Sequence, residues 1–170
     1  SPATNTAQQV QALGRRFIPV QADLSSTAVV PDVMAQALAD AGQVDILVNN
    51  AGIIRRADAL DFSEADWDAV MDTNLKTVFF LSQAVARHML ARKADMAAQG
   101  EAWRGGKIIN IASLLSFQGG IRVPSYTAAK SGLQGITRLL ANEWAAKGIN
   151  VNAIAPGYIE TNNTEALRHD

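Results

Sequence analysis

The feature that most constrains the fold is an alternation of short apolar runs with longer helical patterns. Four runs have the length and residue types of β-strands, at residues 16–21, 45–49, 107–111 and 150–155. Three of them are apolar at almost every position, which suits strands covered on both faces. Between the runs lie helical patterns long enough to cross from one parallel strand to the next, at residues 26–41, 73–96 and 125–147. The sequence therefore predicts an α/β fold with a doubly wound parallel sheet.

The size and charge of the chain limit its organisation and its partners. With 170 residues, of which 48% are hydrophobic, it can bury one core, and we expect a single domain over residues 1–170. Its 15 basic and 16 acidic side chains leave a net charge of -1, which gives no reason to expect nucleic acid or an anionic membrane as partner. The predicted partner is a small molecule.

Cysteine, histidine and the terminal residues bear on metals and location. The chain has no cysteine and two distant histidines, so we expect no metal site. No apolar run has membrane-spanning length, and the first residues lack the pattern of a signal peptide. These features favour a cytoplasmic protein.

Small and polar residues follow several of the predicted strands. In a parallel α/β sheet, functional groups gather beyond the carboxyl ends of the strands. The segments at such ends are Asp23-Leu24, Asn-Asn-Ala-Gly at residues 49–52, Ser113 and Pro156-Gly157. Three of these segments also have a structural interpretation: the aspartate suits a helix cap, and the asparagines and Pro-Gly suit ordinary turns. Their joint order and spacing favour the functional interpretation.

Tyr126 and Lys130 lie four residues apart in a predicted helix and therefore share one face. An ammonium beside a phenol favours the phenolate, which makes such a pair suited to acid–base catalysis. The spacing alone is also common on solvated helix faces. Ser113 precedes the tyrosine by 13 residues, so it can face the tyrosine across the strand-to-helix connection and donate to a substrate oxygen.

Taken together, these motifs resemble the short-chain dehydrogenase/reductase family. Its members carry Asn-Asn-Ala-Gly, a helix asparagine, a serine, Tyr-x-x-x-Lys and Pro-Gly-x-x-x-Thr in this order. The corresponding residues here are 49–52, Asn74, Ser113, Tyr126 with Lys130, and Pro156-Gly157 with Thr161.

The resemblance implies a catalytic role for Asn74, Ser113, Tyr126 and Lys130. In this family Tyr126 would exchange a proton with the substrate, and Lys130 would favour its phenolate and hold the nicotinamide ribose. Ser113 would stabilise charge on the substrate oxygen, and Asn74 would position a water linked to Lys130. Ser116 lies nearby but is not expected to be the catalytic serine, because its spacing to the tyrosine departs from the family pattern.

The resemblance also implies NAD as cofactor, without excluding NADP. The residues expected to bind it are Asp23, Leu24, Asn50, Ala51, Gly52, Tyr126, Lys130, Pro156, Gly157, Ile159 and Thr161. The family's opening strand and glycine-rich turn, which hold the pyrophosphate, have no counterpart among these 170 residues. By comparison with the family, both ends are expected to be cut, the sheet to be incomplete, and the full-length enzyme to have about 250 residues.

Three longer segments, residues 49–56, 113–126 and 155–164, resemble more narrowly the dehydrogenases of 2-dehydro-3-deoxy-D-gluconate and 2-deoxy-D-gluconate. The implied substrate is a deoxy sugar acid, and a guanidinium suits its carboxylate. Arg55, Arg56 and Arg122 are candidates, each of which could instead be solvated. Arg122 with Gln118, beside Ser113 and Tyr126, is the preferred substrate site.

Other functions stay open at this point. Gluconate 5-dehydrogenases and 3-oxoacyl-carrier-protein reductases are the nearest alternatives within the family. A catalytically inactive, truncated subunit with an assembly role is the alternative from another class. The family often forms tetramers, so a homotetramer through the helices at 73–96 and 125–147 is expected, and Trp67, Trp103 and Trp144 are expected in packing or interfaces.

Overall fold

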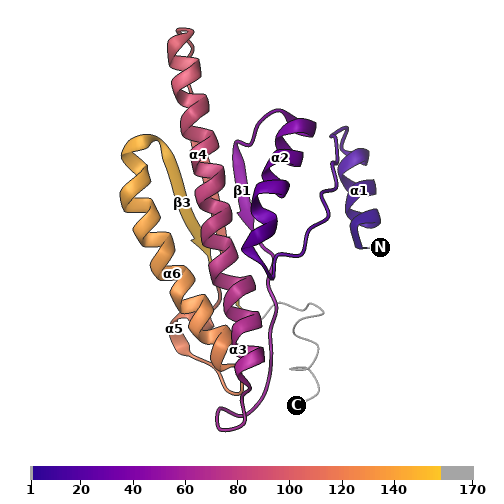
Figure 1. Cartoon of the computed structure of the whole chain (residues 1–170), viewed down its shortest axis with the longest axis vertical. Coiled ribbons are helices and arrows are strands. Elements are labelled where there is room, and N and C mark those ends of the chain that lie inside the picture. Colours follow the sequence, from indigo (N-terminus) through magenta and orange to yellow (C-terminus); the bar gives the residue numbers. More distant parts are fainter. Residues whose placement is uncertain (1, 158–170) are drawn as a thin grey trace.

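The computed structural model describes residues 2–157, and its centre is a three-stranded parallel sheet (Figure 1). The strands are β1 (Ile46–Asn49), β2 (Gly106–Ile111) and β3 (Ile149–Ile154), in the order β1-β2-β3. Asn49 pairs with Asn110, and Ile108 pairs with Val151. Three of the four predicted strands are therefore confirmed, each within one residue.

The prediction of a strand at residues 16–21 is wrong. In the part of the chain that the structure describes, no strand pairs with these residues, and an extended segment without a partner forms no ladder. Pro19 also lacks the N–H that a ladder needs. The segment instead lies against the end of the following helix, where the Arg16 guanidinium donates to the Asp40 carbonyl oxygen at 2.9 Å.

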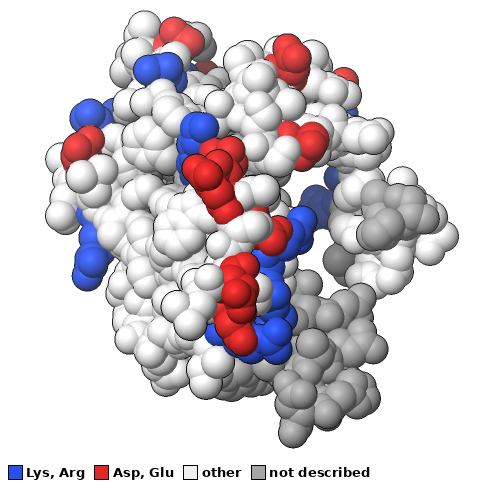
Figure 2. Space-filling view, turned by 60° about the horizontal axis from the view of Figure 1, so that its bottom comes forward, with Lys and Arg blue, Asp and Glu red and all other residues white. Residues whose placement is uncertain are grey.

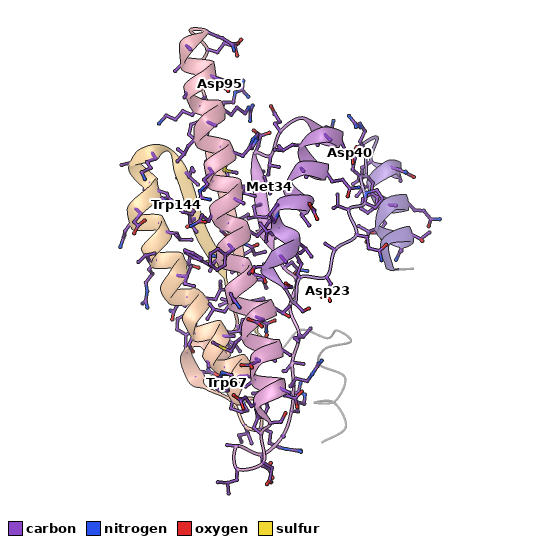
Figure 3. The ribbon with its side chains drawn as sticks, in the orientation of Figure 1. Asp23, Met34, Asp40, Trp67, Asp95 and Trp144 are labelled. Carbon is purple, nitrogen blue, oxygen red and sulfur yellow. The ribbon has the colours of Figure 1, made fainter. Side chains whose placement is uncertain are left out.

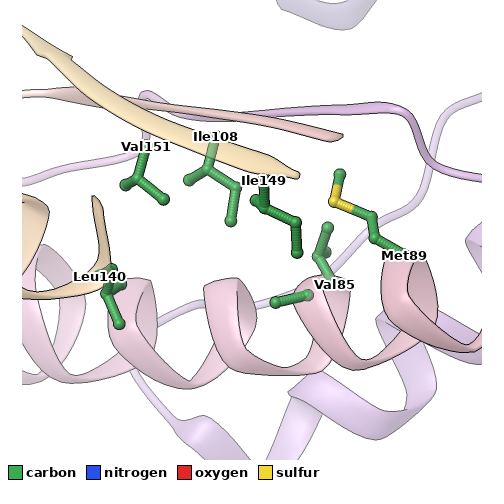
Figure 4. Close-up of a cluster of buried hydrophobic side chains, with 7 residues drawn as sticks. Val85, Met89, Ile108, Leu140, Ile149 and Val151 are labelled. Carbon is green, nitrogen blue, oxygen red and sulfur yellow. The ribbon is translucent and has the colours of Figure 1, made fainter. Parts of the chain in front are cut away.

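Two long helices cover one face of the sheet, α4 (Thr77–Ala98) and α6 (Pro124–Trp144) (Figure 1). Between them and the strands lies the buried hydrophobic cluster of Figure 4. It comprises Val85, Ala86, Met89, Ile108, Leu140, Ile149 and Val151. On the other face, Ile46 and Val48 are 59% and 51% exposed and Ile154 is 55% exposed. The sheet is thus covered on one side by the described residues.

Helix α6 begins at a proline and has no side-chain cap among the described residues. Proline restricts φ to a helical value and lacks the N–H that the first turn leaves free, so Pro124 begins the helix. Ser125 therefore lies inside the first turn, where it is buried and its hydroxyl has no hydrogen-bond partner among residues 2–157. At the far end, Gly148 has a φ of 92°, a left-handed conformation that favours glycine.

The remaining elements are short or lie at the periphery. They are α1 (Pro2–Ala12), η1 (Thr27–Val29), α2 (Val30–Ala41), α3 (Glu64–Met71), the π-helix η2 (Asp72–Lys76), α5 (Leu115–Gln118) and η3 (Ala145–Lys147). None of the helices over residues 2–157 has the length and apolar character needed to cross a bilayer.

The tryptophans divide between packing and surface. Trp103 and Trp144 pack against the hydrophobic cluster, as predicted. Trp67, on α3, is 39% exposed and lies well below Trp144 in Figure 3.

Candidate functional site

The carboxyl ends of the strands bring several of the predicted site segments to one edge, at the lower end of Figure 1. The segment after β2 runs alongside the segment after β3. The N–H of Ala112 donates to the Ile154 carbonyl at 2.8 Å, and the N–H of Leu114 donates to the Pro156 carbonyl at 3.3 Å. Ser113 is therefore held next to Pro156-Gly157. These backbone hydrogen bonds fix the positions of the two segments relative to each other.

Tyr126 and Lys130 lie one turn apart near the beginning of α6. The Lys130 Nζ is 5.6 Å from the centroid of the Tyr126 ring, so the two side chains face each other. Lys130 is only 5% exposed, and its Nζ donates to the carbonyl oxygen of Ile111, the last residue of β2. Burial lowers the pKa of Lys130 to about 8, because desolvation disfavours the ammonium. The site thus contains a lysine that can lose its proton close to neutral pH.

Ser116 connects the segment that carries Ser113 to α6. The Ser116 hydroxyl accepts from the N–H of Ser113 at 3.3 Å and donates to the carbonyl oxygen of Lys130 at 2.9 Å. One hydroxyl therefore joins the backbone of Ser113 to the backbone of Lys130. The Ser113 hydroxyl accepts from the N–H of Leu115 at 3.2 Å, which leaves its own hydrogen free to donate. Ser116 has a structural role here that sequence reasoning missed.

Asn74 lies in the π-helix η2 and is 1% exposed. Its amide group makes two hydrogen bonds of 2.8 Å to Ile53, accepting from the N–H and donating to the carbonyl. Asn74 therefore fixes the backbone that follows the Asn-Asn-Ala-Gly turn. π-helical turns are frequent at functional sites. Its predicted role in positioning a water stays a prediction.

The residues predicted to bind the cofactor leave open backbone at the edge. Ala51 and Gly52 after β1 and Gly157 after β3 are exposed and carry little or no side chain. At Gly52 a Cβ would come within 3.2 Å of the Asn74 Oδ1, so a larger residue would press on that contact. Backbone without bulky side chains allows a ligand to approach closely, as the predicted binding of a dinucleotide requires.

The other predicted cofactor residues differ in what the structure says of them. Asp23 is exposed on the segment leading into α2, and its carboxylate accepts from the N–H of Ser25 at 3.0 Å, which lowers its pKa (Figure 3). The cap of the following helix is Ser26, so Asp23 is free of the capping role. Leu24 is half-buried and Asn50 is exposed. Ile159 and Thr161 lie outside the described residues.

The predicted substrate residues lie on two loops near the same edge. Arg122 has a φ of 63°, and its Nε is 3.0 Å from an oxygen of Asp58. The carbonyl of Arg122 also accepts from the N–H of Ala57 at 3.1 Å, which ties the two loops together. Arg55 pairs with Asp66 at 3.2 Å. Figure 2 looks onto this end of the molecule, where acidic and basic side chains lie next to one another.

Arg122 and Asp58 are 61% and 68% exposed in their side chains, so the pair is screened and can open at low cost. A φ in the left-handed region is uncommon for residues other than glycine and marks a position worth functional attention. Gln118 and Arg56 are exposed. Sequence reasoning missed Asp58, since nothing in the spacing of the two loops predicts that they meet.

A cavity of about 410 Å³ lies elsewhere, at the amino ends of β2 and β3, and is lined by Lys93, Trp103, Lys107 and Gly148 among others. It contains none of the predicted site residues. The strand ends and hydrogen bonds, rather than this cavity, therefore locate the candidate site.

Comparison with known proteins gives a consistent result. The whole chain, residues 1–170, matches the profile of the short chain dehydrogenase family. It is 62% identical over 167 residues to the 2-dehydro-3-deoxy-D-gluconate 5-dehydrogenase of Escherichia coli, a match that covers 98% of this chain and 62% of the relative.

Two solved structures show the same likeness. A putative 2-deoxy-D-gluconate 3-dehydrogenase from Agrobacterium tumefaciens with bound NADP is 56% identical, with a TM-score of 0.81 over 98% of this chain and 62% of that one. A gluconate 5-dehydrogenase from Burkholderia cenocepacia in complex with NADP and tartrate is 38% identical, with a TM-score of 0.84 over 98% and 61%. The chain spans about 62% of the length of the curated relative it matches. By its match over all 170 residues, the chain belongs to the short chain dehydrogenase family.

Proposed function

We propose that the full-length protein is an NAD(P)-dependent oxidoreductase that moves a hydride between its cofactor and a secondary alcohol or ketone of a deoxy sugar acid. The contact between Lys130 and Tyr126 carries the chemical part of this proposal. The substrate class is supported by the 62% identity to a 2-dehydro-3-deoxy-D-gluconate 5-dehydrogenase.

The side chains divide the work as follows. Tyr126 gives its hydroxyl proton to a substrate carbonyl, or takes one from a substrate hydroxyl in the reverse direction. Lys130 lies beside the ring, and its ammonium form stabilises negative charge on the phenol oxygen. Ser113 donates a hydrogen bond to the substrate oxygen and so stabilises the charge that develops there.

The dinucleotide supplies the hydride acceptor or donor. The open backbone of Asn50, Ala51 and Gly52 would hold it after β1, and Pro156-Gly157 would hold it after β3. Asp23 and Leu24 would contact the adenine end, and Ile159 and Thr161 the carboxamide. NAD stays the predicted cofactor, although the two solved relatives above were crystallised with NADP.

Arg122 would hold the substrate carboxylate, with Gln118 beside it. In the structure the Arg122 guanidinium is paired with Asp58. Because the side chains of Arg122 and Asp58 are both exposed, a sugar-acid carboxylate can replace Asp58 as the partner of Arg122. Replacing Arg122 by Ala should lower kcat/KM for a sugar acid by about tenfold or more, while turnover of the neutral polyol analogue stays near the wild-type level. Arg104→Ala, an exposed cation at the amino ends of the strands, serves as the control. An equal loss on both substrates would rule out this role.

The function itself is tested with the full-length protein, NAD and NADP, and a panel of sugar acids and neutral polyols, followed by the absorbance of the reduced cofactor. Turnover of a deoxy sugar acid that disappears in Tyr126→Phe supports the proposal. Preferred turnover of gluconate or of a 3-oxoacyl carrier substrate would replace it with another reductase of the family. Absence of cofactor binding, together with a stable oligomer, would favour an inactive assembly subunit.

The long helices support self-association, with a homotetramer as the expected state. Phe80 on α4 is 41% exposed and Leu139 on α6 is 49% exposed, and in an assembly through these helices both side chains would be buried. We expect this assembly to work in the cytoplasm.

A further inference from the structure

Four polar side chains form a continuous row across the helix-covered face of the sheet, from α4 to α6. They are Ser82, Asn49, Asn110 and Thr137, called here the polar chain. The Asn49 Nδ2 donates to Ser82 Oγ at 3.0 Å and to Asn110 Oδ1 at 2.8 Å, and Asn110 Nδ2 donates to Thr137 Oγ1 at 2.9 Å. The two hydroxyls donate in turn to backbone carbonyls, Ser82 to Val78 at 2.7 Å and Thr137 to Leu133 at 2.8 Å.

The polar chain is deeply buried. Asn110 is 0% exposed, Ser82 is 1%, Asn49 is 6% and Thr137 is 8% exposed. Burying amide and hydroxyl groups costs free energy unless they are hydrogen-bonded, and apolar residues would fill this layer without that requirement. Polar groups in such a place fix one geometry, because each bond has a narrow range of distance and angle. Beyond packing, the polar chain therefore fixes the positions of α4 and α6 relative to β1 and β2.

Three members of the polar chain adjoin different parts of the candidate site. Asn49 directly precedes the open backbone of residues 50–52. Asn110 directly precedes Ile111, whose carbonyl oxygen accepts from Lys130. Thr137 lies seven residues after Lys130 on α6, two turns along the same face of the helix. Helix α6 thus contacts consecutive residues of β2 at two points: Lys130 bonds to Ile111, and Thr137 bonds to Asn110.

We infer that Asn110 and Thr137 are positioning residues, which fix α6 against β2 so that the Lys130 ammonium meets the Ile111 carbonyl and stands beside Tyr126. The catalytic consequence rests on the proposed function. The geometric claim does not, because the contact of Lys130 with Ile111 exists whatever the substrate is. Neither residue touches the reacting atoms, and both act through the placement of Lys130.

The test uses the full-length protein and Thr137→Val, which removes the hydroxyl and keeps a branched side chain of similar size. Lysine ε-amino groups are titrated by NMR, with the Lys130 signal assigned by its absence in Lys130→Met. In wild type this signal should titrate with a pKa of about 8. In Thr137→Val it should move toward the titration of the exposed lysines, and Thr137→Ser should restore the wild-type curve.

Ser82→Ala is the matched control, because it removes a hydroxyl from the α4 end of the same polar chain. It should lower the thermal stability and leave the Lys130 titration unchanged. If Thr137→Val does not fold, Thr137→Ala removes the same hydroxyl and is measured in the same way. A wild-type Lys130 titration in the folded Thr137 variant would overturn the inference.

Turnover gives a second readout. If the sugar acid is a substrate, Thr137→Val should lower kcat by about tenfold with a much smaller change in KM, because a misplaced catalytic group slows the chemical step more than it weakens binding. If the wild-type protein turns over no sugar acid, the proposed function fails, and the NMR titration still decides the positioning role.

Discussion

At the scale of single residues, Ser113 and Ser116 are two similar side chains for which we propose different roles, chemical for Ser113 and structural for Ser116. Ser113→Ala removes the hydrogen that would be donated to the substrate oxygen, so kcat should fall by about 10²-fold, while the free energy of unfolding changes little. Ser116→Ala removes the hydroxyl that joins Ser113 to Lys130, so it should cost about 1–2 kcal/mol of stability and lower kcat less. Steady-state kinetics and urea unfolding of both variants measure the two effects. The opposite ranking would contradict both assignments.

Lys130 predicts a pH dependence of stability. Its pKa is about 8 in the folded protein and near 10.5 when it is exposed, so between these values the unfolded chain holds the extra proton. Stability therefore rises with pH across this window, by up to about 1.4 kcal/mol per pH unit. Below pH 8 the lysine is charged in both states, so the free energy of unfolding is lowered by the full cost of burying the ammonium.

The comparison protein is Lys130→Met, which has no group to titrate at this position. The difference in unfolding free energy between wild type and Lys130→Met should shift in favour of wild type as pH rises from about 8 to 10.5. Denaturant unfolding at several pH values measures this difference, and other titrating groups cancel in it. A difference that stays constant with pH would show that Lys130 is solvated.

At the scale of elements, α6 and the turn that follows it contain glycines with opposite expected effects. Gly135 lies inside the helix, and a Cβ there would meet nothing within 4 Å. Gly135→Ala should stabilise the protein by about 0.5–1 kcal/mol, because alanine loses less backbone entropy in a helix.

Gly148, just after the helix, has a φ of 92° and lies against the Trp103 ring, where a Cβ would come within 2.8 Å of a ring carbon. Gly148→Ala should therefore destabilise the protein, since the backbone strain and the clash with the ring add. Thermal unfolding of the two variants should show melting temperatures on opposite sides of wild type. Equal shifts in one direction would contradict the packing described for η3 and β3.

The elements also show what a sequence can and cannot predict. The strands β1, β2 and β3 follow from their apolar runs, because a buried parallel strand has few alternatives to such a composition. Helix α3 was missed although Ser63 caps it through the N–H of Asp66 at 3.1 Å, a pattern visible in the sequence. Residues 16–21 have the composition of a strand, but pairing depends on a partner that composition does not supply.

The candidate site divides in the same way. The residue types of Ser113, Tyr126 and Lys130 and their spacing could be recognised along the chain. The pairing of Arg122 with Asp58 could not, because it depends on how two loops meet in space. Asn110 carried a usable signal, since a lone amide in the apolar strand β2 needs a buried partner.

At the scale of the whole molecule, the exposed apolar residues of α4 and α6 predict assembly. Leu139→Asp places a charge on the outer face of α6, where it should break the proposed helix contacts and reduce the mass of the full-length particle in solution. Leu60→Asp is the control, because Leu60 is fully exposed on the loop before α3 and belongs to neither helix. Sedimentation velocity of both variants measures the change. A wild-type oligomer in Leu139→Asp would place the interface elsewhere.

The polar chain has one more consequence, which concerns the order of its hydrogens. Every hydrogen bond in it runs outward from Asn49, and both ends are backbone carbonyls, which accept and cannot donate. The hydroxyls of Ser82 and Thr137 therefore have a single orientation, and reversing the row would leave its ends without partners. Side-chain amides neither gain nor lose protons near neutral pH. The row therefore does not relay protons, and the proton exchange proposed at Tyr126 would use another route to solvent.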